Sequence, residues 1–103
     1  MKSMYLISYD IENTPLRTKI AKLLIKVGFH RVQYSVFMGT VSPTALKKLQ
    51  KALQRLQKLE KWTPEDSVML LPLHQYSKEN IHFIGPKPLR WEEISGEIHT
   101  LVL

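Results

Sequence analysis

The chain has 103 residues, 44% hydrophobic and 23% charged, the composition of one globular domain. The absence of cysteine excludes disulfides, thiolate nucleophiles and cysteine-based zinc or iron–sulfur sites. A net charge of +6 favours a polyanionic partner, and no apolar run reaches the length of a membrane span. Because the first residues do not resemble a secretory signal, we expect a cytoplasmic protein without a membrane partner.

The first two elements are predicted to be a strand and a helix. Residues 4–10, MYLISYD, are rich in strand-forming types. Thr14 followed by Pro15 predicts a helix start with Thr14 as the cap. Apolar residues then recur at helical spacing until Gly28, which predicts the helix end.

The middle of the chain repeats the pattern of extended chain followed by a helix. Residues 31–41, RVQYSVFMGTV, alternate in polarity but are long for one strand, so a bulge or a fold-back is expected near Ser35 or Gly39. Ser42 and Pro43 repeat the cap-then-proline signature, and leucines at helical spacing follow.

The last third supplies two more predicted strands. Residues 67–73, SVMLLPL, are apolar throughout, which is typical of a strand buried on both faces. Residues 97–103, EIHTLVL, predict a further strand at the C-terminus. The order predicts an α+β, ferredoxin-like βαββαβ sandwich with one additional C-terminal strand. We assign residues 1–73 to its core, and residues 74–103 to an extension of the same domain that packs on the core or on a dimer partner.

A second copy of the chain is the expected cover for one side of the sheet. Two helices can cover only one face, yet the strands carry apolar groups on both faces, including Leu6, Ile7, Met69 and Leu70. We therefore expect a homodimer that packs sheet on sheet.

Positive charge is concentrated on the two predicted helices. Residues 14–28 and 43–59 contain no acid, whereas each contains several cations. This segregation favours nucleic acid as the partner, and a solvated lysine-rich face is the plainer alternative. The second helix carries a stripe with spacings of three and four, formed by Lys48, Lys51, Arg55 and Lys58.

Asp10 is the candidate for chemistry. It follows Leu6 and Ser8 on one face of the first strand and leaves the strand just before a helix start, where phosphate groups bind well and Arg17 lies in the first turn. Two interpretations remain open. Asp10 is either a turn or cap residue, or a ligand of a hard cation such as Mg²⁺ or Mn²⁺. One carboxylate per chain is too few for a two-metal site, but a dimer would supply a second.

Three segments in order, YLISYDI, TKIAKLLIKVGFHRVQYSVFMG and SVMLLPL, give the chain a resemblance to the CRISPR-associated Cas-two family over roughly residues 4–73. The resemblance implies a ferredoxin-like homodimer in which Asp10 is a divalent-metal ligand and nuclease residue. It also implies a central dimer of the adaptation complex, which bridges two dimers of the CRISPR integrase and holds duplex DNA during spacer acquisition. The alternative is a stand-alone metal-dependent endoribonuclease or toxin-type RNase that acts on single-stranded RNA.

The resemblance also assigns roles to individual residues. Asp10 is the expected catalytic residue and metal ligand, with Ser35 and Phe37 in support. Met38 stands where many relatives carry an acid, which removes one polar contact. Together with the charge pattern, the expected nucleic-acid-binding residues are Tyr9, Arg17, Lys19, Arg31, Lys48, Lys51, Arg55 and Lys58.

Overall fold

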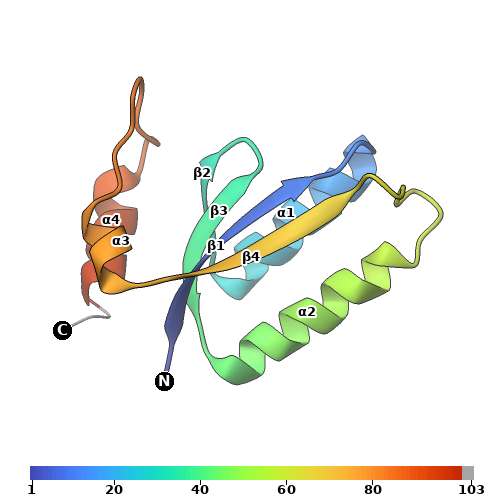
Figure 1. Cartoon of the computed structure of the whole chain (residues 1–103), viewed down its shortest axis with the longest axis horizontal. Helices are drawn as coiled ribbons and strands as arrows, with labels where there is room; N and C mark the ends of the chain where they lie inside the picture. The colour runs from blue at the N-terminus through green and yellow to red at the C-terminus, as the bar shows by residue number, and fades with distance from the viewer. Residues whose placement is uncertain (101–103) are drawn as a thin grey trace.

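The protein is an antiparallel four-stranded sheet with helices on both sides (Figure 1). The computed structural model describes the backbone of residues 1–100 and the side chains of residues 1–96. The strand order is β2-β3-β1-β4, so the predicted α+β, ferredoxin-like βαββαβ fold is confirmed. Among the described residues, no helix is both long enough and apolar enough to cross a membrane. The elements are β1 (Ser3–Asp10), α1 (Thr14–Val27), β2 (His30–Gln33), β3 (Val36–Val41), α2 (Pro43–Gln57), β4 (Ser67–Leu73), α3 (Gln75–Glu79) and α4 (Trp91–Thr100).

The main core lies between one face of the sheet and helices α1 and α2. Alternation along β1 sends Ile7 and Tyr9 toward the helices and leaves Leu6 and Ser8 on the other face. Phe37 of β3, in register with Ile7, is fully buried beside them. The helices contribute Leu16, Ile20, Leu24, Leu49 and Leu53 to the same cluster. Because the apolar stripes of both helices are used here, their lysines and Arg55 remain exposed to solvent.

The helix boundaries follow the predicted caps with one exception. Ser42 caps α2 by accepting a hydrogen bond from the Ala45 N–H at 3.1 Å. Gly28 ends α1 at φ 105°, a left-handed conformation that glycine adopts without strain. The prediction of Thr14 as the first cap was wrong by one residue. Asn13 caps α1, because its side chain reaches the Leu16 N–H at 3.0 Å.

Two predictions for the strands can be compared with the structure. The long segment 31–41 folds back as expected, since β2 ends at Gln33 and β3 begins at Val36. The prediction that residues 67–73 are buried on both faces was wrong. β4 is an edge strand whose Met69 and Leu71 side chains remain 54% and 43% exposed. Its uninterrupted apolar sequence therefore includes one face that this chain does not cover.

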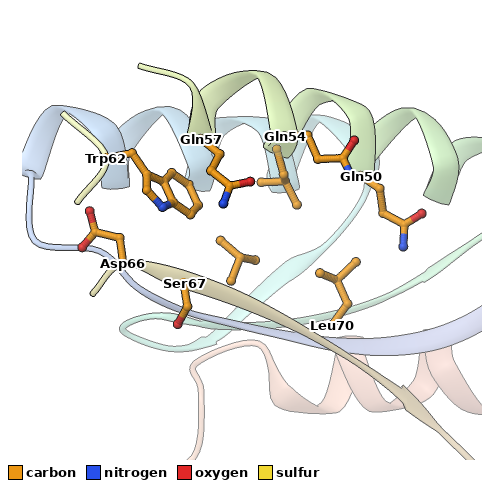
Figure 2. A pocket seen from close by; sticks show the side chains of 9 residues that line it. Gln50, Gln54, Gln57, Trp62, Asp66, Ser67 and Leu70 are labelled. Atoms are coloured by element: carbon orange, nitrogen blue, oxygen red, sulfur yellow. The ribbon is translucent and has the colours of Figure 1, made fainter. Parts of the chain in front are cut away.

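The segment after β4 covers part of the second face of the sheet. Ile94 of α4 is buried against Met4, Val32 and Met38, and Figures 1 and 2 show the sheet between α2 and α4. The additional C-terminal strand, predicted over residues 97–103, was wrong for residues 97–100, which continue α4, and residues 101–103 lie outside the described residues. Glu92 and Glu93 in the first turn favour a helix, because acidic side chains stabilise its N-terminal dipole.

One carboxylate connects the two loops at the end of the sheet where β1 stops. Asp66 Oδ1 accepts a hydrogen bond from the Glu12 N–H at 3.0 Å, and Oδ2 accepts one from the Thr63 N–H at 2.8 Å. These bonds favour the ionised carboxylate. The Thr63 amide, followed by the Glu12 amide, therefore lowers the pKa of Asp66 below its usual 3.8, although partial desolvation opposes the shift.

The lowered pKa predicts an acid-sensitive contribution to stability. A group whose pKa is lower in the folded chain stabilises that chain above its unfolded pKa, and the contribution is lost as the pH falls through the folded value. The difference in unfolding free energy between wild type and Asp66→Asn should therefore be largest above about pH 4 and shrink below that value. Urea denaturation at several pH values measures it, with Glu65→Gln as the control for loss of a neighbouring exposed carboxylate. A difference that does not change with pH would contradict the assignment.

Candidate functional site

Asp10 is the last residue of β1, and its side chain is exposed. It is in register with Ser67, the first residue of the edge strand β4, at the end of the β1–β4 pair. Its face of the sheet is the one that carries Leu6 and Ser8, away from α1 and α2. The capping role next to it belongs to Asn13. Asp10 is therefore a solvent-accessible carboxylate on a rigid strand.

A single chain offers Asp10 as one ligand rather than a complete metal site. Among the described residues, no three histidine, cysteine, aspartate or glutamate side chains gather closely enough to hold an ion. Mg²⁺ keeps several waters and is often held by one or two carboxylates plus substrate phosphate, so Asp10 fits that mode as one such carboxylate. A second Asp10 carboxylate would come only from a second chain.

Arg17 is held by the loop that follows β1. Its Nη1 donates to the carbonyl oxygens of Ile11 and Glu12 at 2.9 and 2.8 Å, and its Nη2 donates to Thr14 Oγ1 at 2.7 Å. The guanidinium was predicted to contact phosphate, but its fork is largely used on these acceptors. In this structure Arg17 fixes the backbone just after Asp10.

The start of α1 is less suited to phosphate than its sequence indicated. Pro15 lacks an N–H, and the Asn13 side chain already occupies the Leu16 N–H. Glu12 and Glu60 line the open hollow of about 520 Å³ at this helix end, with Lys61 beside them. Two carboxylates there oppose the attraction of the helix dipole for an anion.

Tyr9 and Phe37, two of the predicted site residues, belong to the main core. Tyr9 is only 5% exposed, and its ring stacks on Phe37 with the centroids 6.1 Å apart. Ser35 contributes a backbone oxygen that accepts from the Tyr9 N–H at 3.0 Å, so it ties the β2–β3 turn to β1. In this structure the Tyr9 ring is therefore not accessible for stacking on a base.

Arg31 lies on the helix-covered side of the sheet, away from Asp10. Its guanidinium carbon is 5.0 Å from the centroid of Phe37, which is in register with Ile7. Ile7 precedes Asp10 by three residues, about 10 Å along the strand. Because side chains alternate between the two faces of a strand, an odd separation places Ile7 and Asp10 on opposite faces. The structure therefore does not bring Arg31 and Asp10 together.

The remaining predicted cations form a continuous exposed set on α1 and α2. The helices lie side by side over one face of the sheet, and neither contains an acid. Lys19, Lys22 and Lys26 extend along α1. The exposed cations on α2 and at its C-terminal cap are Lys47, Lys48, Lys51, Arg55 and Lys58.

A hollow of about 430 Å³ separates α2 from the open edge of β4. Figure 2 shows Gln50, Gln54 and Gln57 on its α2 side, with Trp62 at one end and Asp66 on the loop before β4. Of the described residues that line the hollow, Asp66 carries the charge, and that charge is negative. The exposed cations of α2 therefore lie outside this glutamine-lined hollow.

Asp66 and Asn13 are the residues near Asp10 that sequence analysis missed. The bond from Thr63 to Asp66 spans three residues in a proline-containing turn, a local pattern that turn chemistry can indicate. The bond from Glu12 to Asp66 spans 54 residues and depends on β1 and β4 being neighbours. No local signal could have identified that contact.

Comparison with known proteins identifies the family. Residues 1–81 match the family described as CRISPR associated protein Cas2. A relative from Synechocystis, named CRISPR-associated endoribonuclease Cas2 3, is 38% identical over 84% of this chain and 88% of its own length. The crystal structure of a hypothetical protein from Thermus thermophilus aligns with a TM-score of 0.69 at 30% identity, covering 86% of this chain and 98% of that one. Streptococcus pyogenes Cas2 aligns with a TM-score of 0.66 at 27% identity, covering 80% and 99%. The chain belongs to the CRISPR-associated Cas2 family.

Proposed function

We propose that this protein binds duplex DNA through the sugar–phosphate backbone and scaffolds the CRISPR integrase during spacer acquisition. The observation that carries the proposal is the exposed set of cations on α1 and α2, which has no acid among it. Lysine binds phosphate as a point charge and does not read bases, which suits a protein that must accept many sequences.

The length of the cationic surface suits a duplex. The 15 residues of α2 give a helix of about 22 Å, the length of roughly six base pairs. Lys51 and Arg55 are one helical turn apart on its solvent side, with Lys58 on the next turn. A phosphate backbone laid along this helix would meet a cation at each turn.

Reversing two of these charges should weaken DNA binding strongly. For Lys51→Glu combined with Arg55→Glu, we expect at least a roughly tenfold loss of duplex affinity and a salt slope smaller by about 2, because each lost phosphate contact removes about 0.9. Fluorescence anisotropy titrations at several salt concentrations measure both quantities.

The matched control changes the same net charge elsewhere. Lys2→Glu combined with Lys87→Glu alters two exposed lysines outside α1 and α2. Equal losses in the two double variants would mean that net charge, rather than this surface, governs binding.

A second candidate function is metal-dependent cleavage of RNA at Asp10. It is supported by the exposed position of this carboxylate at the end of β1, and by the endoribonuclease names of relatives such as the one from Synechocystis. In this proposal Asp10 holds Mg²⁺ or Mn²⁺, which when bound lowers the pKa of a water and stabilises charge on the phosphate. The chain itself supplies a fixed carboxylate and cations that retain the polynucleotide.

Asp10→Asn should separate the two functions. Because the amide is a poor ligand for a hard cation, we expect RNA cleavage to fall about 100-fold or more, the usual scale for a lost catalytic group. Duplex affinity should stay within about twofold, since Asp10 is not part of the cationic surface. Cleavage of labelled single-stranded RNA with Mg²⁺, Mn²⁺ or EDTA measures the first quantity, and anisotropy measures the second. Glu12→Gln is the control, and undiminished cleavage by Asp10→Asn would exclude the mechanism.

We further propose that two chains pair through the uncovered part of the second sheet face. Leu71 and Met69 are exposed on this face, in register with Leu6 and Ser8. The next pair along the same face is Asp10 and Ser67. A two-fold pairing there would bring two Asp10 carboxylates toward each other and supply the ligand that one chain lacks.

A charge on this face should therefore prevent dimer formation. Leu71→Lys and Leu59→Lys make a matched pair, because the two leucines are 43% and 42% exposed but Leu59 lies at the end of α2. Light scattering after size exclusion should give the mass of two 12.0 kDa chains for wild type and Leu59→Lys, and of one chain for Leu71→Lys. A monomeric wild type would contradict this dimer.

A further inference from the structure

Asp66 holds the two chain segments that flank Asp10. One of its carboxylate oxygens accepts from the Glu12 N–H and the other from the Thr63 N–H. Glu12 lies two residues after Asp10, and Asp66 immediately precedes Ser67, the register partner of Asp10. The carboxylate thus closes the end of the β1–β4 ladder at the position of Asp10.

Arg17 holds the same segment through hydrogen bonds to its backbone carbonyl oxygens. The Ile11 and Glu12 carbonyl oxygens both accept from Nη1 of Arg17, while the Glu12 N–H donates to Asp66. Donor and acceptor of Glu12 are therefore both engaged, by side chains from two different elements. The ends of strands open more readily than their centres, and this arrangement opposes such opening beside Asp10.

We propose that Asp66 is a positioning residue for Asp10. It acts through the backbone of residues 11–12 and the start of β4, and touches neither cation nor substrate. The inference rests on the proposed cation-dependent cleavage at Asp10. It extends that proposal by naming Asp66, which immediately precedes β4, as the residue that fixes the backbone next to Asp10.

The two hydrogen bonds that Asp66 accepts determine which variants test the proposal. Asp66→Asn keeps the size of the side chain but retains one acceptor oxygen, so only one of the two backbone N–H groups can be satisfied. Asp66→Ala retains none. The effects should therefore increase from Asn to Ala. Glu65 is adjacent to Asp66 in the chain and exposed, so Glu65→Gln is the control for the loss of one negative charge.

The first measurement tests the contact itself. Amide hydrogen exchange by NMR should show a protected Glu12 N–H in wild type and Glu65→Gln, and at least about tenfold faster exchange in Asp66→Ala. Equal exchange of the Glu12 amide in wild type and Asp66→Ala would overturn the inference.

The second measurement tests whether the contact matters at Asp10. With Mn²⁺ alone as the probe, paramagnetic broadening of the Asp10 and Ile11 amide signals reports cation binding. Partners that orient a metal ligand typically contribute 10- to 100-fold, and because Asp66 acts through the backbone we expect about tenfold weaker Mn²⁺ binding in Asp66→Ala. In RNA cleavage well below the melting temperature, kcat should fall about tenfold, while KM stays within about twofold.

The outcomes separate this inference from the function on which it rests. A wild type that neither broadens with Mn²⁺ nor cleaves RNA refutes the proposed cleavage, and the inference with it. A wild type that does both, with Asp66→Ala matching it in Mn²⁺ affinity and kcat, refutes the positioning role alone. A purely structural role would lower the melting temperature of Asp66→Ala and leave kcat unchanged, which also overturns the inference.

Discussion

The packing of α1 and α2 on one face of the sheet is the constraint on which the rest of the structure depends. Ile7 and Phe37 are fully buried against these helices, and alternation along β1 then fixes which side chains turn the other way. Asp10 is among those that turn away. The same packing uses the apolar stripe of each helix and leaves the lysines of both helices and Arg55 exposed to solvent. The exposure of the helix lysines and the position of Asp10 both follow from this one interface.

The exposed cations of α1 and α2 and the Asp10 side chain therefore lie on different sides of the sheet. A polynucleotide laid along Lys51 and Arg55 does not reach the Asp10 of the same chain by that contact alone. In the proposed scaffold, DNA binding therefore needs no catalytic contribution from Asp10. The proposed cleavage would instead draw on a second chain and a different approach of the substrate. The two proposed activities thus use different surfaces of the same small fold.

Several side chains with the right chemistry for a site serve the fold itself. Arg17 binds backbone carbonyls of the loop after β1, Tyr9 packs on Phe37, and Asp66 ties two loops together. Arg17 and Asp66 satisfy backbone acceptors and donors that would otherwise lose partners at the end of the sheet. Rigidity at this end is a reasonable requirement for a carboxylate that must hold a fixed orientation.

Local patterns in the sequence determined the element order through β4, the Ser42 cap, the Gly28 helix end and the exposed lysines, because each depends on spacing or on residues within one turn. The resemblance in three short segments also identified the family and marked Asp10. Only the tertiary structure decided that β4 is an edge strand and that Asp66 reaches the Glu12 amide beside Asp10. These two features depend on contacts between segments far apart in the chain, and no local propensity encodes such contacts.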